Sequence, residues 1–485
     1  MTPATRPTSS ADAGWEPVIG LEIHVQLRTR TKMFCSCALS FGEEPNTRTC
    51  PVCLGLPGAL PVTNAEAVHH GLMMGLALGC EIAPRSIFHR KNYFYPDQAK
   101  NYQISQYDIP LCTGGGLGDV RLHRIHLEED AAKLVHVGAS GRIHGADYSM
   151  VDYNRGGTPL AEIVTEPDLH SAEQARDWLG LLRETLRQLG VSDVNMEEGS
   201  LRCDANVSVR RAGTTELGVK TELKNMNSFR FLAQGVEAEI ERQVALREAG
   251  EAVTQETLHF DPVSGRLSSL RSKEEAHDYR YFPEPDLVAI APTREMLDRA
   301  RAALPELPAD RAARLEGDHG LHADAARLLA FRPELGDFFE AAIAADGSYP
   351  LGVGNWVTGE LLSRLGDRDP DQTALEPGAL ARLVAMVEEG EVAGSAAKEV
   401  LGVLVEEGGD PAAIVQDRGL ARAGGDELGT IVDQAMVDNA DAVKKIRGGN
   451  HKAIGAIVGA VMKATKGTAD GGEVQRLVRE RIEPR

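Results

Sequence analysis

The chain has 485 residues, which is enough for about three domains and for a sizeable hydrophobic core that needs no disulfide support. Its 52 Lys and Arg residues against 72 Asp and Glu residues give a net charge of −20, which excludes a protein that grips nucleic acid along its whole surface. Hydrophobic residues make up 42% and charged residues 26%, so wholesale disorder is excluded as well.

The first residues, 1–16, are rich in Thr, Ser, Ala and Pro and contain no apolar segment, so we expect a disordered leader rather than a secretory signal. The longest uncharged apolar runs, 71–79 and 453–462, are too short for a membrane-spanning helix, which needs ~18–20 residues. The seven Cys residues are unevenly placed, unlike the disulfide framework of a secreted protein. These features predict a cytoplasmic protein without a membrane segment.

Three segments of the front half alternate between apolar and polar side chains. They are residues 20–27, 202–209 and 219–224, and in the first of them Glu22 and His24 share the polar face. Several half-buried strands with polar faces indicate an antiparallel sheet with one wet side. We therefore expect an α+β front half.

Two close pairs of Cys residues follow the first predicted strand: Cys35 and Cys37, then Cys50 and Cys53. Two pairs separated by a short loop supply four thiolates that can surround a zinc ion as a tetrahedron. Four Cys ligands leave no open position, so the role of such a zinc would be structural. The alternatives are reduced thiols or a disulfide, and a disulfide is uncommon in a cytoplasmic chain.

Three acidic segments are candidates for a divalent-cation site. Glu22 and His24 point to the same side of the first strand, residues 126–130 include three consecutive acids, and Glu162 lies among apolar residues. If the three segments meet in space, their carboxylates suit Mg²⁺, with an imidazole as a further ligand. The alternative is a solvated acidic surface, because strands that face water commonly carry Glu and His.

Aromatic residues make up only 5% of the chain, yet six of them lie between residues 88 and 107, interleaved with Arg90, Lys91 and Lys100. This mixture suits stacking on a base or ribose with phosphate pairing, and equally a core layer flanked by cations. The sequence contains neither a phosphate-binding P-loop nor a Gly-x-Ser-x-Gly nucleophile. The chain is therefore expected to lack a hydrolase centre of its own.

After residue 292 the sequence changes to Gly-bounded segments rich in Ala, Leu, Glu and Arg, which predict helices. Together with one helix in the front half, the expected helices are 171–190, 294–303, 322–330, 377–389, 393–406, 427–439 and 473–481. The loop 407–411 is a candidate boundary within this half. The last segment, 440–485, carries a net charge of +5 and leaves −25 on the rest of the chain, so a basic patch ends an acidic protein.

Long stretches of the sequence resemble the family of B subunits of the bacterial glutamine-dependent aspartyl/glutamyl-tRNA amidotransferases. The stretches that carry the resemblance are Ile19-Gly-Leu-Glu-Ile-His-Val-Gln-Leu27, Cys50-Pro-Val-Cys-Leu-Gly-Leu-Pro-Gly58, Arg90-Lys-Asn-Tyr-Phe-Tyr-Pro-Asp97, Tyr102-Gln-Ile-Ser-Gln106, His126-Leu-Glu-Glu-Asp130, Asn195-Met-Glu-Glu-Gly-Ser-Leu-Arg202 and Asp278-Tyr-Arg-Tyr-Phe-Pro-Glu-Pro-Asp286. The helical half matches more loosely, through Gly354–Glu360 and Met462–Gly467.

The resemblance implies an activity and a set of partners. The front half would be the family's cradle domain, where ATP phosphorylates the Asp or Glu on a misacylated tRNA(Asn) or tRNA(Gln) and ammonia then displaces the phosphate. The chain would thus act in a carbon–nitrogen ligase with glutamine as the amide donor. An amidase-type A subunit would release the ammonia, and a small C subunit would complete a heterotrimer. The extra domain of the archaeal relative has no room between residues 290 and 410, which favours the bacterial enzyme.

The resemblance also implies site residues. The family's Mg²⁺ cluster falls on His24, Glu129 and Glu162, with Glu22 beside it. The four Cys residues match the members of the family that keep a structural Zn²⁺. The residues expected near ATP and the substrate are Arg90, Lys91, Tyr93, Asp204 and Asn206.

The expected organisation is an antiparallel-sheet cradle domain with a zinc loop, an all-α helical domain and a small all-α tail that binds tRNA. The expected bounds are 1–16 for the leader, 17–292 for the cradle, 293–408 for the helical domain and 409–485 for the tail. The candidates for phosphate contacts in the tail, with a solvated helix face as the alternative, are Lys444, Lys445, Arg447 and Lys452.

Two other functions stay open here: a zinc-stapled tRNA scaffold without chemistry, and a stand-alone ATP-dependent carboxylate–amine ligase. Whether Asn-tRNA, Gln-tRNA or both are made depends on the tRNA synthetases of the organism.

Overall fold

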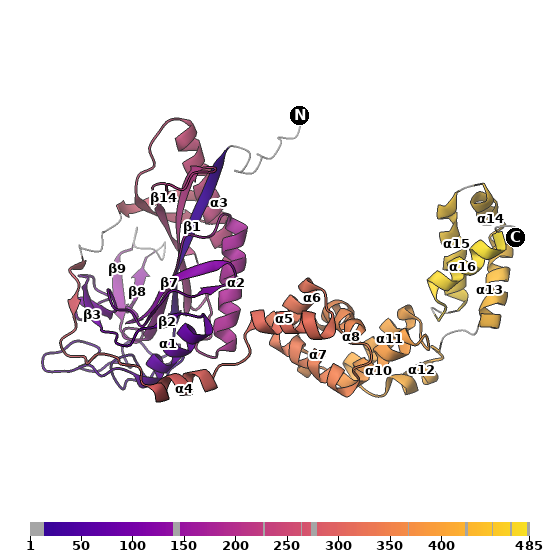
Figure 1. Ribbon diagram of the computed structural model, residues 1–485, viewed down its shortest axis with the longest axis horizontal. Helices are drawn as coiled ribbons and strands as arrows, with labels where there is room; N and C mark the ends of the chain where they lie inside the picture. The colour runs from indigo at the N-terminus through magenta and orange to yellow at the C-terminus, as the bar shows by residue number, and fades with distance from the viewer. Residues whose placement is uncertain are drawn as a thin grey trace. The chain divides into compact units, whose positions relative to one another are not determined.

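The computed structural model describes residues 14–482 apart from 139–145, 227, 263, 273–278, 367, 422–424, 449 and 466–467 (Figure 1). Most of the expected leader, Asp278 of the front-half motif, and Lys466 and Gly467 of the last motif lie outside the described residues. The chain divides into two compact units, residues 1–307 and 308–485. The first unit combines a large sheet with helices, and the described part of the second unit is built from helices.

Ten described strands form one sheet in the order β14-β13-β12-β11-β1-β10-β7-β5-β2, with β6 paired to β7 outside this order. Their bounds are β1 (Trp15–Gln26), β2 (Glu81–Ile82), β5 (Cys112–Thr113), β6 (Gly116–Leu117), β7 (Val120–Glu129), β10 (Pro159–Thr165), β11 (Leu201–Arg211), β12 (Thr221–Met226), β13 (Glu256–Asp261) and β14 (Arg266–Ser272). The pairings are antiparallel except that of β12 with β13. The expected antiparallel sheet thus contains one parallel pair, because helix α3 (Phe229–Glu248) forms the crossover between these two strands.

Helices cover the apolar face of this sheet. α2 (Ala172–Gln188) and α3 run along it (Figure 1), and α1 (Ala65–Ala77) packs on β7. The central strand β1 buries Leu21, Ile23 and Val25 completely in the same hydrophobic cluster as these helices. The alternation predicted for residues 20–27 is therefore confirmed. Burial of this kind, at about 25 cal/mol per Å² of apolar surface, is the main stabilising term of the unit.

Two smaller sheets complete the first unit. One has the order β15-β3-β4, with β3 (His89–Asn92), β4 (Tyr102–Ser105) and β15 (Phe282–Pro283), and the other pairs β8 (Lys133–Val137) with β9 (Tyr148–Asp152). Helix α4 (Arg294–Ala302) packs on α1, and Arg299 forms an ion pair with Glu66 at 3.2 Å. The first unit therefore extends beyond residue 292, where the sequence had suggested a boundary, because the apolar side of α4 belongs to its core.

The second unit holds α5 (Pro308–His319), α6 (Ala323–Phe331), α7 (Pro333–Ala345), α8 (Pro350–Trp356), η3 (Val357–Leu361), α9 (Leu362–Leu365), η4 (Pro370–Gln372), α10 (Pro377–Glu388), α11 (Gly394–Glu407), α12 (Pro411–Arg418), α13 (Gly425–Asp438), α14 (Ala440–Arg447), η5 (His451–Ala453), α15 (Ile454–Ala464) and α16 (Gly471–Ile482). Its apolar side chains form two clusters, one from Leu315 to Leu420 and one from Leu428 to Val478. α12 contributes Val415 to the earlier cluster, so the change of packing lies after residue 420. None of the described helices combines the length and the apolar character needed to cross a membrane.

Candidate functional site

A row of polar side chains crosses the middle of the large sheet on the face opposite its helices. Antiparallel pairing places His24 on β1 opposite Glu162 on β10, and Glu162 opposite His126 on β7. Glu128 follows His126 by two residues and shares its face. His24 Nε2 lies 3.5 Å from a Glu162 oxygen and 3.7 Å from a Glu128 oxygen. His126 Nε2 lies 3.2 Å and 3.6 Å from the same two carboxylates. We call these four residues the histidine–carboxylate cluster.

The contacts within the cluster favour the charged forms of its side chains, although burial opposes them. Burial raises the pKa of Glu162, but the neighbouring imidazoles of His126 and His24 outweigh it and hold that pKa well below its usual value. Glu128 behaves in the same way: burial raises its pKa, and the bond to His126 outweighs burial, so the pKa is lowered. Burial lowers the pKa of His126, but the charges of Glu162 and Glu128 raise it to about 9. Two carboxylates are thus held charged side by side, which suits a site for a cation.

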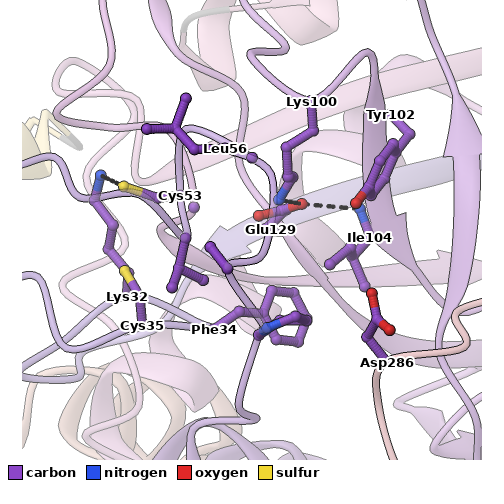
Figure 2. A pocket seen from close by; sticks show the side chains of 15 residues that line it. Lys32, Phe34, Cys35, Cys53, Leu56, Lys100, Tyr102, Ile104, Glu129 and Asp286 are labelled. Carbon is purple, nitrogen blue, oxygen red and sulfur yellow. Dashed lines mark hydrogen bonds and ion pairs between the residues drawn. The ribbon is translucent and has the colours of Figure 1, made fainter.

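The structure brings Glu128, not Glu129, together with His24 and Glu162. These three side chains offer ligand atoms that all lie within 4.8 Å of one another. The Glu129 side chain lies on the other face of β7, where it forms an ion pair with Lys100 and accepts a hydrogen bond from the backbone N–H of Ile104 at 2.9 Å (Figure 2). Strand alternation is the sequence signal that selects Glu128, since His126 and Glu128 are two residues apart.

The polar face continues from this cluster onto β11 and β12. Glu22 accepts a hydrogen bond from the Asn206 amide at 2.8 Å, and Asp204 accepts one from Lys224 Nζ at 3.2 Å. Burial lowers the pKa of Lys224, but Asp204 and Glu222 outweigh it, so the pKa is raised and the ammonium stays charged. Glu22, Asp204 and Asn206 therefore lie on the expected face, and their hydrogen bonds tie neighbouring strands together.

Lys91 brings a positive charge to the same place from the small sheet. Its ammonium lies 4.9 Å from the centre of the Tyr279 ring and forms no ion pair with any residue that the structure describes. Burial lowers the pKa of Lys91, but nearby Tyr281, Glu128 and Glu162 outweigh it and raise the pKa. A direct contact joins the two sheets as well, because Ser105 Oγ donates to Glu128 at 2.9 Å.

An unusual turn presents the two tyrosines beside Lys91. Arg280, between them, has a φ of 47°, a conformation that residues other than Gly rarely adopt. Asn92 holds this turn, because its amide donates to the carbonyl oxygens of Tyr279 at 3.1 Å and of Arg280 at 2.8 Å. The Tyr281 ring stacks on Tyr107, with 4.4 Å between the ring centres. The sequence patterns gave no role to Asn92 or Tyr281. Asn92 lies on β3, and Tyr281 reaches the site because β15, which follows it, pairs with β3.

Arg90 forms an ion pair within the region of the small sheet, and Tyr93 contacts a neighbouring aromatic ring. The Arg90 guanidinium donates to both oxygens of Glu284, at 2.7 Å and 2.9 Å, and lies 4.4 Å from the centre of the Tyr102 ring. Tyr93 packs beside Tyr95 with 5.9 Å between ring centres. The aromatic segment thus divides between the two sequence interpretations: Arg90 ties β3 to the chain near residue 284, whereas Lys91 faces the cluster.

The four Cys residues of the first loop meet, as their spacing predicts. Their sulfur atoms all lie within 4.8 Å of one another, and those of Cys50 and Cys53 are 3.9 Å apart. A hydrogen bond with Cys35 is the largest cause that lowers the pKa of Cys53, to about 4, whereas burial raises the pKa of Cys37 to about 11. The loop is docked on the end of β9, where Asn46 exchanges hydrogen bonds with residues 151–153.

A cavity lies between this Cys loop and the Glu129 side of β7 (Figure 2). It contains about 470 Å³ of empty space, open solvent at its mouth included. The residues that line it are Lys32, Phe34, Cys35, Val52, Cys53, Gly55, Leu56, Ala59, Pro61, Lys100, Tyr102, Ile104, Glu129, Gly157 and Asp286. The ion pair of Lys100 with Glu129 is part of its wall. The side chains of the adjacent residues Glu128 and Glu129 thus point to opposite faces of β7.

The four predicted tail contacts lie close together in the second unit. Lys444, Lys445 and Arg447 stand in the last turn of α14, and Lys452 follows in η5. All four side chains are exposed, and none forms an ion pair with another described residue. Their charges are therefore available to an external anion.

Two family models match the chain: one described as the GatB/GatE catalytic domain covers residues 17–298, and one described as the GatB domain covers residues 337–482. Among curated relatives named as the B subunit of aspartyl/glutamyl-tRNA(Asn/Gln) amidotransferase, that of Frankia casuarinae is 52% identical over 97% of this chain and 96% of its own length. Those of Thermobifida fusca and Moorella thermoacetica are each 49% identical, over 99% and 96% of this chain and 96% and 100% of their own lengths. The chain therefore belongs to the family of aspartyl/glutamyl-tRNA(Asn/Gln) amidotransferase B subunits.

Proposed function

We propose that this chain is the subunit of a tRNA-dependent amidotransferase that converts the Asp or Glu on misacylated Asp-tRNA(Asn) or Glu-tRNA(Gln) to the amide. In chemical terms it works in a carbon–nitrogen ligase that uses ATP and takes its nitrogen from glutamine. Family membership over nearly the whole chain supports this activity. The observation that carries the choice of site is the histidine–carboxylate cluster with the Lys91 ammonium facing it.

The chemistry needs an activated acyl group. A free carboxylate does not react with ammonia at a useful rate, because its carbonyl is electron-rich and it has no good leaving group. Transfer of a phosphoryl group from ATP to the carboxylate supplies that leaving group. Lys91 is the residue placed to attract the phosphate or the substrate carboxylate, since its charge is not taken by an ion pair with a described residue.

The donor set of the cluster fits a magnesium ion. Two carboxylates held charged, with an imidazole within reach, are oxygen-rich ligands of the kind that Mg²⁺ takes together with water and phosphate oxygens. His24, Glu128 and Glu162 would hold the ion, which when bound offsets the negative charge that builds up as phosphate meets carboxylate. Ser105 and His126 fix the orientation of the two carboxylates by their contacts with them.

The four-Cys cluster fits a structural zinc ion. Tetrahedral zinc–thiolate bonds of about 2.3 Å place neighbouring sulfur atoms roughly 3.8 Å apart. The Cys50 and Cys53 sulfur atoms, at 3.9 Å, already have this spacing. Zinc would close the loop between residues 35 and 53, which is docked beside the cavity and has little core of its own.

The partners follow from the same assignment. We propose that an amidase-type A subunit supplies ammonia, that a small C subunit completes the complex, and that the complex works in the cytoplasm on tRNA. The first unit would act as the cradle for the aminoacyl end of the tRNA, residues 308–420 as a helical connector and residues 421–485 as the tail that holds the tRNA elsewhere. The exposed cations of α14 and η5, which form no ion pairs with described residues, support the role of the tail.

The test is amide formation on Glu-tRNA(Gln) and Asp-tRNA(Asn) by this chain reconstituted with A and C subunits, glutamine, ATP and Mg²⁺. Glu128→Gln should lower the rate about 100-fold or more while glutamine hydrolysis by the A subunit persists. The matched control is Glu166→Gln, which changes an acid just after β10, the strand paired with β7. Glu166 pairs with His123 at the surface, so the rate should be unchanged. Full amidation activity of the Glu128→Gln variant would favour the alternative that this chain is a zinc-stapled tRNA scaffold that takes no part in the chemistry. Amide formation on free Glu or Asp without tRNA would favour a stand-alone ligase.

A further inference from the structure

Lys32 is a fully buried lysine at the edge of the four-Cys cluster. Its side chain is among the largest fully buried ones of the described chain, with a residue exposure of 1%. Its backbone N–H donates to the carbonyl oxygen of Cys37 at 3.0 Å, so the residue is part of the Cys loop. Its ammonium donates to the carbonyl oxygen of Tyr153 at 3.0 Å and contacts the Cys53 sulfur at 3.7 Å (Figure 2).

This buried charge has no carboxylate partner among the residues that the structure describes. Glu129 lines the same cavity, but its carboxylate pairs with Lys100. An ammonium taken out of water without an anion is costly, and one carbonyl oxygen does not replace its hydration. The charge therefore calls for a negative group at the place where the sulfur atoms gather.

The surroundings fix the direction of the Lys32 side chain. Gly157 lies against it, and a Cβ at position 157 would be 3.3 Å from Cδ of Lys32 and 3.7 Å from Cβ of Cys53. Gly157 also has a φ of +88°, which favours glycine. The aliphatic part of the lysine thus lies in a slot with glycine as one wall, and its end reaches the sulfur of Cys53.

A zinc ion held by four thiolates carries a net charge of −2, because four negative ligands exceed the charge of the metal. At four half-buried sulfur atoms, where water screens the charge only in part, that excess is costly as well. A contact between the zinc–thiolate group and the Lys32 ammonium leaves a net charge of −1. It lowers the free-energy cost of removing either charge from water.

We propose that Lys32 is the buried counter-ion of the four-Cys zinc site and that its charge raises the affinity of the site for zinc. This rests on the proposed zinc site and is independent of the amidation reaction. It makes Lys32 a positioning residue of the metal site, a role that the sequence motif of four Cys residues does not include.

The experiment titrates the full chain, stripped of metal under reducing conditions, with Zn²⁺ against a chromophoric chelator. Lys32→Met keeps the length of the side chain without its charge, and we expect 10- to 100-fold weaker zinc binding. Lys32→Gln keeps a donor for the Tyr153 carbonyl and should show the same loss. The matched control is Lys100→Met, the lysine of the same cavity whose partner is Glu129, and its zinc affinity should equal that of the wild type.

Thermal unfolding separates the counter-ion from a merely structural lysine. Lys32→Met should lower the Tm of the zinc-loaded chain more than that of the metal-free chain, in which the ammonium contacts a single sulfur, that of Cys53, and no metal–thiolate group. An equal loss of Tm in both forms, or a wild-type zinc affinity in Lys32→Gln, would overturn the proposal. A wild-type chain that binds no zinc would overturn the zinc site and this proposal together, while the amidation assay would still stand.

Discussion

Glu128 and Glu129 are adjacent in sequence and have different surroundings. Glu128 meets His24 and His126 on the polar face of the sheet, whereas Glu129 meets Lys100 and the backbone of Ile104 on the other face. Each carboxylate is buried, so each needs its partner to offset the free-energy cost of burying a charge. At this scale the structure assigns distinct contributions to two residues that look equivalent in the sequence.

The two carboxylates should respond differently to neutralisation. Glu128→Gln is expected to weaken binding of Mn²⁺, used as a probe for Mg²⁺, at least tenfold, because it removes a charged ligand. Glu129→Gln should leave Mn²⁺ binding unchanged and lower the free energy of unfolding by about 3 kcal/mol, because it leaves the Lys100 charge buried and unpaired. Electron paramagnetic resonance measures the first effect and urea unfolding the second. Weaker Mn²⁺ binding in Glu129→Gln, with unchanged binding in Glu128→Gln, would assign Glu129 to the proposed cation site instead.

The pKa of His126 makes a prediction about pH. Its value of about 9 in the folded chain exceeds the unfolded value near 6.5, so the proton-bound pairs with Glu162 and Glu128 stabilise the fold fully below about pH 6.5. That contribution, on the order of 3 kcal/mol, is lost as the pH rises through 9. In metal-free buffer, the stability difference between wild type and His126→Gln should therefore shrink from pH 6.5 to 9.5. A difference that stays constant with pH would contradict this assignment.

Among whole elements, the Cys loop is the one that depends on a ligand. Cys50→Ser should lower the zinc content from about one per chain towards zero and reduce the Tm, because metal binding contributes directly to the folding of so small a loop. Elemental analysis of the purified chain measures the content, with Cys203→Ser, a buried thiol on β11, as the control. Unchanged zinc in Cys50→Ser would exclude the four-Cys site.

Elements differ in how far the sequence predicts them. The alternation of residues 20–27 predicted β1, and the expected helix 171–190 matches α2, where Ser171 Oγ accepts from the N–H of Gln174 at 3.1 Å. Helix α1 was not predicted, because its residues from Ala67 to Gly75 are all buried and leave no polar stripe to reveal a helical period. A strand or helix with one solvent-exposed face shows a period of polar residues that reveals it in the sequence. An element that is buried on all sides shows no such period.

The candidate site, too, could be predicted only in part from the sequence. The residue types of the histidine–carboxylate cluster and of the Cys loop could be predicted from motifs. Other contributions could not be predicted, because Tyr281 reaches the histidine–carboxylate cluster only through a contact between segments far apart in the chain. The pairing of β15 with β3 joins residues about 190 positions apart, and no local pattern specifies it.

On the scale of the whole molecule, the two hydrophobic clusters of the helical unit suggest where it can be cut. A chain that ends at residue 420 keeps Val415 and Leu420 in the earlier cluster, whereas one that ends at residue 410 loses both. The shorter chain should be less stable by about 2–5 kcal/mol, as for other losses of buried aliphatic side chains. Thermal unfolding of the two truncated chains measures the difference. Equal stability would mean that α12 is dispensable to the packing of α10 and α11.

The same truncation tests the tail. Removal of residues 421–485 takes away a basic segment from an otherwise acidic chain, so tRNA binding should weaken and its dependence on salt should become less steep. Glutamine hydrolysis by the reconstituted complex should survive, because the proposed A subunit carries it out and the truncation leaves the first unit of this chain intact. Fluorescence titration with labelled tRNA at several salt concentrations is the measurement. Wild-type affinity in the truncated complex would remove the tail from the tRNA contact.

The placement of Glu128 and Glu129 on opposite sides of β7 also limits how this strand can evolve. Loss or gain of a single residue within β7 ahead of His126 would exchange the two sides, bringing Glu129 towards His24 and turning Ile125 and Leu127 away from the core. A substitution alters one side chain, but a change in length moves every side chain of the strand that follows it. Across related chains, insertions and deletions should therefore be excluded from β7 even where its side chains vary.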